Sequence, residues 1–165
     1  MKQLFLTALI SVALNGFTQE IPNGVRILDR DQPINSLSEL TTLLDGKAFY
    51  LDRWATWCAP CLIEFKHSEA LHEFLDDNGI EMVYLNSDQE FDKEKWLDYM
   101  GKFQLKGNHL WLSPELKEDL VNQGYFIPRL PQYMVIDKTG NVVENNALKP
   151  SSGEELYSQL QDLLK

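Results

Sequence analysis

Cysteine is scarce in this sequence. Only Cys58 and Cys61 occur among 165 residues, and a bridge between them would close a very short loop, which constrains the unfolded chain little. The composition is 44% hydrophobic, which is enough to build a core without disulfides. A structural staple is therefore not required, and the pair needs another explanation.

Metal ligands are also few. The histidines are His67, His72 and His109, whereas zinc normally takes four ligands. Positions 67 and 72 would fall on different sides of one helix, so they cannot hold a metal together. We predict no metal site and interpret each histidine as a surface or core-edge residue.

Positive charge is in short supply. Fifteen Lys and Arg residues stand against 25 Asp and Glu, for a net charge of −10. Phosphate backbones repel such a polyanion, and no Lys/Arg cluster reverses this locally. Nucleic acid is excluded as a partner.

The N-terminal apolar run is short. It covers residues 4–14, well below the ~20 residues that span a bilayer. Lys2 precedes the run and small or polar residues follow it, a layout typical of a secretory signal peptide; the alternatives are a core helix or a membrane anchor. We predict a signal peptide at 1–18, cleaved between Gly16 and Glu20, and a soluble, exported, periplasmic domain at 19–165. Thiols outside the cytoplasm tend to be oxidised.

Hydrophobic periodicity and turn residues predict an α/β domain with no repeat or linker. The expected strands are residues 25–28, 47–54, 81–85, 109–112, 133–136 and 141–144. The expected helices are residues 37–44, 60–78, 92–103, 113–123 and 154–164. This order predicts a central sheet with helices on both faces.

The two cysteines follow a strand and open a helix. The unpaired N–H groups and dipole of a helix N-terminus lower the pKa of a nearby thiol. Cys58, at the exposed cap position, would attack a substrate disulfide, and the more buried Cys61 would then release the product. Pro60 fits the first helical turn and rigidifies it. The pattern indicates a reactive dithiol.

Two residues near the pair have alternative interpretations. Asp52 lies inside an apolar strand: it either points to solvent or is a buried carboxylate of raised pKa that takes the Cys61 proton. Trp54 and Trp57 are either core or a platform for partners. We interpret Trp54 as core and Trp57 as the exposed rim.

Three motifs then carry a family resemblance. Trp54-Ala55-x-Trp57-Cys58-x-Pro60-Cys61 resembles the active site of the thioredoxin superfamily, and Asp52 matches its buried aspartate. The segment from Leu130-Pro131 to Asp137 is similar to its cis-proline strand. Extra strand–helix material at 80–124 and the export signal make the chain most similar to the TlpA/ResA branch of exported bacterial thiol-disulfide oxidoreductases.

The resemblance implies a thioredoxin-like fold, in which a mixed sheet is flanked by helices and carries a strand–helix insertion. It also implies an enzyme that reduces protein disulfides in the cell envelope. The partners would be protein disulfides and an upstream dithiol donor, a membrane thiol reductase, and no cofactor is needed beyond the cysteine pair. The catalytic residues would be Cys58, Cys61, Asp52 and a cis Pro131, and the substrate contacts Trp57, Ala59, Pro60 and the Leu130 backbone.

One departure from the family pattern stands next to Asp52. Arg53 occupies a position that is usually apolar in the family, and strand alternation directs Asp52 and Arg53 to opposite faces. Other functions remain open. The same fold serves disulfide oxidants and isomerases, and a binding module without turnover is an alternative of another class. A thiol peroxidase is disfavoured because the proline upstream of its cysteine is missing.

Overall fold

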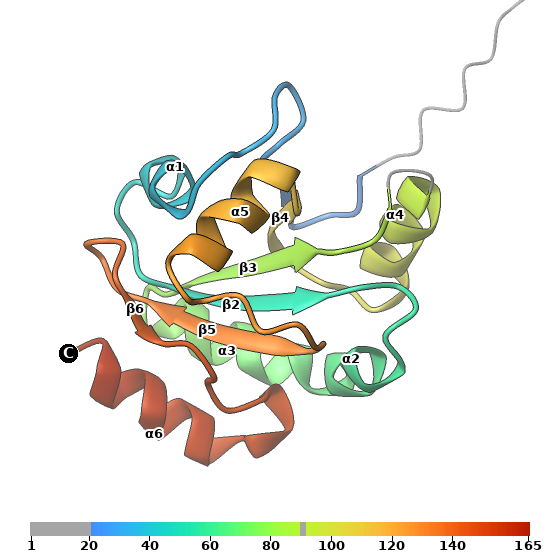
Figure 1. Cartoon of the computed structure of the whole chain (residues 1–165). Coiled ribbons are helices and arrows are strands. Elements are labelled where there is room, and N and C mark those ends of the chain that lie inside the picture. The colour runs from blue at the N-terminus through green and yellow to red at the C-terminus, as the bar shows by residue number, and fades with distance from the viewer. Residues whose placement is uncertain (1–20, 90–91) are drawn as a thin grey trace, which may run out of the picture.

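One mixed sheet organises the described residues, which are 21–89 and 92–165 of this computed structural model. The predicted signal peptide lies outside them. The strand order is β1-β4-β3-β2-β5-β6 (Figure 1). The first four strands in that order are parallel, and β5 and β6 are antiparallel to their neighbours. Their bounds are β1 Val25–Ile27, β2 Phe49–Trp54, β3 Glu81–Asn86, β4 Gly107–Trp111, β5 Gln132–Ile136 and β6 Val142–Glu144.

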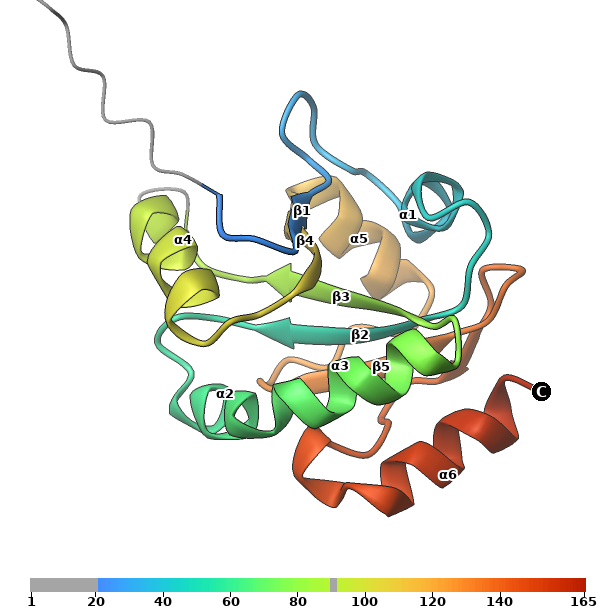
Figure 2. The same cartoon turned by 180° about the vertical axis from the view of Figure 1, so that it is seen from behind.

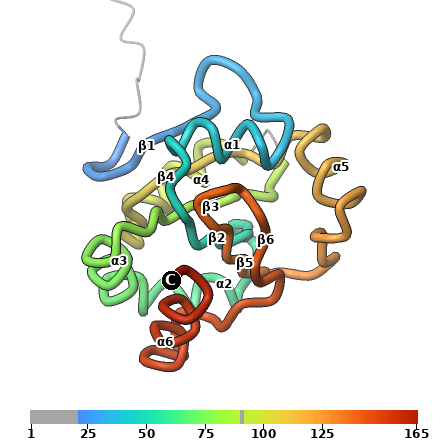
Figure 3. Tube along the Cα trace, turned by 90° about the vertical axis from the view of Figure 1, so that its left-hand side faces the viewer, coloured from blue at the N-terminus to red at the C-terminus, as the bar shows by residue number. Residues whose placement is uncertain are grey.

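Helices cover both faces of the sheet, as predicted (Figures 2 and 3). One face carries α1 (Leu37–Leu43) and α5 (Pro114–Asn122). The other face carries α2 (Ala59–Glu64), α3 (Ser68–Asp77), α4 (Lys93–Lys102) and α6 (Glu154–Leu163). Serine side chains cap α1 and α5: Ser36 and Ser113 each accept a hydrogen bond from the backbone N–H three residues on.

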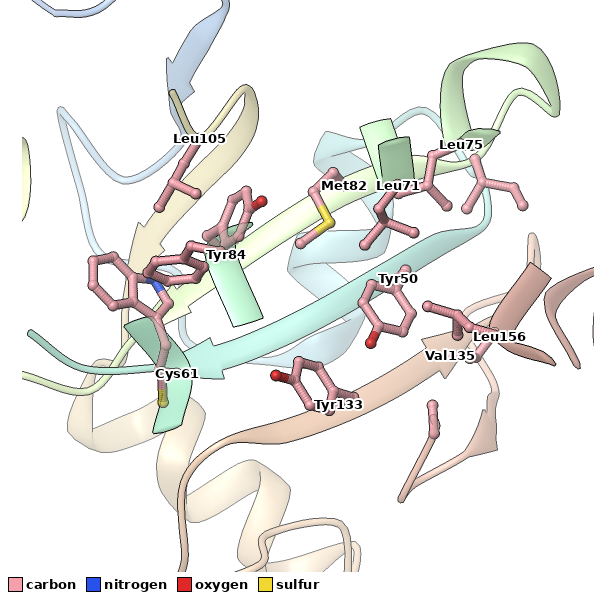
Figure 4. Close-up of a cluster of buried hydrophobic side chains, with 14 of the residues drawn as sticks. Tyr50, Cys61, Leu71, Leu75, Met82, Tyr84, Leu105, Tyr133, Val135 and Leu156 are labelled. Atoms are coloured by element: carbon pink, nitrogen blue, oxygen red, sulfur yellow. The ribbon is translucent and has the colours of Figure 1, made fainter. Parts of the chain in front are cut away.

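Strand alternation divides the core into two layers. In β2, Phe49 and Leu51 face α1 and α5, whereas Tyr50 and Trp54 face the layer of α2 and α3. Figure 4 shows the second layer, in which Cys61 lies within the same cluster as the strand tyrosines. The Cys58–Cys61 pair is therefore built against the hydrophobic core.

The predicted helix at 60–78 is interrupted. A 3-10 turn, η1 (Phe65–His67), separates α2 from α3, and the Ser68 hydroxyl donates to the Phe65 carbonyl at 2.8 Å. The other predicted elements match within two residues at each end, and a 3-10 turn, η3 (Pro150–Ser152), leads into α6. The predicted insertion consists of β3, α4, β4 and α5, with β4 lying between β1 and β3. Across residues 21–89 and 92–165, the helices are all too short or too polar to cross a membrane.

The histidine interpretation is wrong for two of the three residues. His72 and His109 are buried. His72 Nε2 lies 2.9 Å from the Tyr84 hydroxyl, and His109 Nε2 lies 2.8 Å from the Leu105 carbonyl. These partners satisfy Nε2 of each ring, whereas His109 Nδ1 is buried without a hydrogen-bond partner among the described residues. Burial lowers the pKa of each to about 4.

Candidate functional site

Cys58 and Cys61 form a disulfide at the start of α2. Their Cα atoms are 5.3 Å apart. Cys58 is the N-cap of the helix, with its Sγ 3.3 Å from the Cys61 backbone N–H that donates to it. Its own N–H donates to the Ala55 carbonyl at 3.0 Å, which closes the turn after β2. Pro60 lies in the first helical turn, where no backbone N–H is needed.

The predicted exposure of Cys58 is wrong. Its residue exposure is 3% and that of Cys61 is 0%, since the Cys58 sulfur turns toward Cys61 and the helix to form the disulfide. The predicted order of burial is nevertheless confirmed. A substrate must reach the pair from a surface on which little of either sulfur is exposed.

Asp52 is buried, with 1% of its surface exposed. It lies between Tyr50 and Trp54 on the face covered by α2, the same face as Cys61. Its Oδ1 makes no hydrogen bond to any described residue. Burial first, and the nearby Glu64 charge second, raise the pKa of Asp52 well above its usual range. The interpretation of Asp52 as a buried carboxylate is confirmed, and the solvent-facing alternative is wrong.

Two tyrosines flank Asp52 in the sheet. Tyr84 of β3 and Tyr133 of β5 are its direct neighbours in register. The Tyr133 hydroxyl is buried without a hydrogen-bond partner among the described residues. Burial, and then the Asp52 charge, raise the pKa of both phenols, which keeps them protonated. Asp52 therefore sits among neutral aromatic groups that supply no compensating charge.

Glu64, on α2, is a functional neighbour that sequence analysis missed. Its carboxylate accepts hydrogen bonds from the Ser151 N–H at 2.9 Å and the Ser151 hydroxyl at 3.1 Å, and pairs with Lys149 at 3.2 Å. Burial acts to raise the pKa of Glu64, but these Ser151 and Lys149 contacts outweigh it and leave the pKa lowered. Glu64 is thus ionised on the helix that begins at the disulfide. Its partners Lys149 and Ser151 are 85 and 87 positions away in the sequence, so no local pattern reveals them.

Asp88 is a second residue that sequence analysis missed. Its carboxylate accepts the Thr56 N–H at 2.9 and 3.0 Å, the Thr56 hydroxyl at 3.1 Å and the Asn86 amide at 2.8 Å. Thr56 lies two residues before Cys58, so the end of β3 anchors the loop that presents the cysteine. The available signal was a polar Asn-Ser-Asp run directly after a buried strand, which ends at the same sheet edge as β2.

The surface around the disulfide is apolar. Trp57 is 65% exposed and Ile63 is 57% exposed, while Ala59 and Pro60 are exposed as well. Trp54 is fully buried, so the division of the two tryptophans into core and rim is confirmed. The substrate-binding roles of Trp57, Ala59 and Pro60 remain predictions.

The Leu130–Pro131 peptide bond is cis, as expected from the resemblance. Both residues are half-buried and lie directly before β5. The contact of Leu130 with a substrate chain and of Pro131 with the disulfide remain predictions. Over the part of the chain that the structure describes, no group of three or more His, Cys, Asp or Glu side chains could hold a metal ion.

Sequence comparison finds a thioredoxin-like family model and relatives that are named thiol-disulfide oxidoreductases. A family model described as thioredoxin-like matches residues 46–142. The thiol-disulfide oxidoreductase ResA of Bacillus anthracis is 29% identical over 122 residues, covering 74% of this chain and 64% of the relative. A ResA from Halalkalibacterium halodurans is 26% identical over 124 residues. The chain thus spans slightly less than two thirds of the length of the curated relatives it matches.

Solved structures share the fold. A candidate thiol-disulfide oxidoreductase from Bacteroides vulgatus is 30% identical, with a TM-score of 0.55 over 74% of this chain and 79% of that protein. A thiol-disulfide oxidoreductase from Bacteroides fragilis, at 23% identity and a TM-score of 0.57, covers 72% of this chain and 82% of its own; this second likeness concerns the fold alone. The predicted fold class is confirmed.

Proposed function

This chain belongs to the thioredoxin-like family, and from that premise we propose that it is a thiol-disulfide oxidoreductase whose reactive group is the Cys58–Cys61 pair. One observation carries the proposal. The two sulfurs are bonded to each other at a helix start, on the sheet face that also holds a buried carboxyl group of raised pKa.

The reaction begins from the dithiol. The Cys58 thiolate attacks one sulfur of a substrate disulfide, forms a mixed disulfide and expels the other substrate sulfur as a thiolate. The Cys61 thiolate then attacks the Cys58 sulfur, which releases the second substrate thiolate and gives the Cys58–Cys61 disulfide. Two electrons pass from the enzyme to the substrate, and the structure shows the enzyme in its oxidised form.

Asp52 assists the second step. Cys61 is completely buried, so its thiol cannot lose its proton to bulk water. The raised pKa of Asp52 brings the proton affinity of this carboxylate closer to that of a thiol. Asp52 accepts the Cys61 proton, directly or through a water molecule, as Cys61 attacks.

Electrostatics favours the reducing direction. Residues 54–63, which include the pair and its nearest sequence neighbours, contain no Lys, Arg or His, and the Glu64 carboxylate on the same short helix is paired with Lys149. Without a cation beside Cys58, its thiolate and therefore the reduced pair receive little extra stabilisation. A dithiol that is poorly stabilised gives up its electrons readily, which makes the enzyme a reductant.

We infer the cellular setting from the predicted signal peptide and from the names of the relatives. The enzyme acts in the cell envelope, exported by residues 1–18 and free in the periplasm. Its substrates are protein disulfides, which lie against Trp57, Ala59, Pro60 and the Leu130 backbone. Each turnover leaves a disulfide, so an upstream dithiol donor such as a membrane thiol reductase must restore the pair.

Trapping of the mixed disulfide tests the function. In Cys61→Ser the resolving sulfur is absent, so Cys58 should stay bound to a peptide that supplies a disulfide, and mass spectrometry should find the adduct on Cys58. Cys58→Ser is the matched control and should form no adduct. Equal trapping by both variants would refute the separate roles assigned to Cys58 and Cys61, and trapping by neither would refute the enzyme and leave a binding module.

A further inference from the structure

Arg53 is a buried cation on the face of β2 opposite to Asp52. It is 3% exposed, and its position in the strand is one that the family pattern fills with an apolar residue. No described carboxylate is within ion-pair distance of its guanidinium. Burial lowers the pKa of Arg53 to about 10, which still leaves it charged at neutral pH. Its charge must be satisfied in another way.

The guanidinium is bonded to the segment that leads to Pro131. Nη2 donates to the Ile127 carbonyl and, at 3.0 Å, to the Arg129 carbonyl, and Nε donates to Gln132 Oε1 at 3.0 Å. The guanidinium carbon lies 4.2 Å from the centre of the Phe126 ring. Arg53 thus contacts the chain on both sides of Leu130 and Pro131.

Gln132 extends the same network. Its Nε2 donates to the Tyr125 carbonyl at 2.6 Å and to Asn145 Oδ1 at 3.0 Å, and its Oε1 also accepts the Ile127 N–H at 3.3 Å. Residues 125–131 belong to no helix or strand. The N–H groups of Tyr125 and Phe126 donate to the Leu120 carbonyl of α5. The carbonyls of Ile127 and Arg129 are bonded instead to the Arg53 side chain.

Filling space in the core does not explain why residue 53 carries a charged side chain. An apolar side chain would fill the space without the desolvation cost of a cation. The planar guanidinium offers several donors in fixed directions and stacks on an aromatic ring, which neither an apolar side chain nor lysine can reproduce. The guanidinium of Arg53 is therefore suited to holding the Ile127 and Arg129 carbonyls at defined positions.

We propose that Arg53 is a positioning residue that fixes the main chain of residues 127–130 and thereby sets the affinity for the substrate polypeptide. The proposal rests on the proposed function, because it takes the Leu130 backbone as the substrate contact. Arg53 faces away from the layer that contains the disulfide and Asp52. It therefore governs substrate binding and leaves the chemistry of the sulfurs unchanged.

Arg53→Met and Arg53→Lys test this assignment in the oxidised, full-length protein. Amide hydrogen exchange should become at least about tenfold faster in residues 125–132 of both variants, since neither side chain can make the three bonds. In a separate assay with the reduced protein, a peptide disulfide as substrate and a small dithiol that regenerates the Cys58–Cys61 pair, KM for the peptide should rise about tenfold while kcat and the reduction potential keep their wild-type values. Lys117→Met is the matched control, because exposed Lys117 Nζ lies over the same Phe126 ring at 5.4 Å and makes no hydrogen bond to the segment.

The outcomes separate the two proposals. Unchanged exchange in residues 125–132, or wild-type behaviour of Arg53→Lys, would overturn the positioning role. A change in kcat or in the potential with KM unaltered would also overturn it. If the wild-type protein shows no turnover, the proposed function fails, and the exchange experiment still decides whether Arg53 holds the segment.

Discussion

Asp52 shows how one residue links folding to chemistry. A carboxyl group that is buried without a charged partner disfavours its own ionisation. Its pKa is therefore raised in the folded protein and normal in the unfolded chain. The folded state holds this proton more tightly, so rising pH above about 4 draws the equilibrium toward unfolding until the folded pKa is reached.

Asp52→Asn should accordingly stabilise the oxidised protein at neutral and alkaline pH. The gain in the free energy of unfolding should be small near pH 4 and should grow as pH rises. Only in the wild type does folding require a carboxyl group that is ionised in the unfolded chain to take up a proton or to be buried with its charge. The attack of Cys61 on the mixed disulfide, which releases the substrate from Cys58, should slow by roughly 10²-fold, a typical contribution of a general base. Urea unfolding at several pH values and stopped-flow release measure the two effects. Asp77→Asn, an exposed site on α3, is the control; equal stability curves for the two variants would contradict the account.

The sequence was informative about Asp52 but did not decide its environment. A charge in an apolar strand marks an unusual position, yet alternation alone allows either face. The decision comes from α2 and Trp54, which cover that face. Arg53 was harder still. Its partners Ile127, Arg129 and Gln132 are 74 to 79 residues away, so no local pattern could connect them.

At the scale of elements, the loop of residues 55–57 that precedes Cys58 depends on contacts with the end of β3. The loop from Ala55 to Trp57 has no regular structure, and the Asp88 carboxylate at the end of β3 satisfies its Thr56 N–H and hydroxyl. The adjacent Ser87 N–H donates to the Trp54 carbonyl at 2.8 Å. The position of Cys58 is thereby tied to the β2–β3 pair.

Asp88→Ala should release this loop. The buried Thr56 N–H would lose its acceptor, which should lower the free energy of unfolding by about 1–3 kcal/mol. Hydrogen exchange at Thr56 should accelerate more than exchange in α6, which is remote from the loop. Asp98→Ala, an exposed site on α4, should leave both quantities near the wild-type values. Uniform acceleration across the molecule would show that Asp88 acts only through global stability.

Most helices and strands were predictable from the sequence, because the apolar spacing, the serine caps and the turn residues indicate the same beginnings and ends. The break at Phe65–His67 was not predicted. Leu62 and Phe65 keep helical spacing before it and Leu71 and Leu75 after it, but the six-residue step from Phe65 to Leu71 does not continue one apolar face. The pairing of β4 between β1 and β3 was also not predictable. Spacing reports which residues are buried, whereas strand order depends on contacts between distant segments.

At the scale of the whole molecule, buried histidines affect acid stability. His72 is neutral in the fold with a pKa of about 4, and its ordinary value in an unfolded chain is about 6.5. Between these values the unfolded chain binds the extra proton. Stability from this residue is complete above about pH 6.5 and is lost as pH falls toward 4.

His72→Gln should remove this loss while retaining a partner for Tyr84. Relative to the variant, the wild type should lose up to about 1.4 kcal/mol of unfolding free energy per pH unit between pH 6.5 and 4. Comparing the two proteins cancels the opposing contribution of Asp52 and most of that of His109, whose pKa is lowered mainly by burial and only in small part by His72. Urea unfolding over this range measures the slope, with exposed His67→Gln as control. Parallel curves for wild type and His72→Gln would contradict the buried, neutral histidine.

The central claim is that Cys58 and Cys61 form a reversible redox pair that donates electrons. An equilibrium titration of the oxidised protein against a thiol redox buffer, followed by thiol labelling of the two cysteines, tests it most directly. The account predicts a single two-electron transition at roughly −230 mV or below, in the range of reductants. A transition near roughly −120 mV would indicate an oxidant, and the absence of any reversible transition would contradict the enzyme itself.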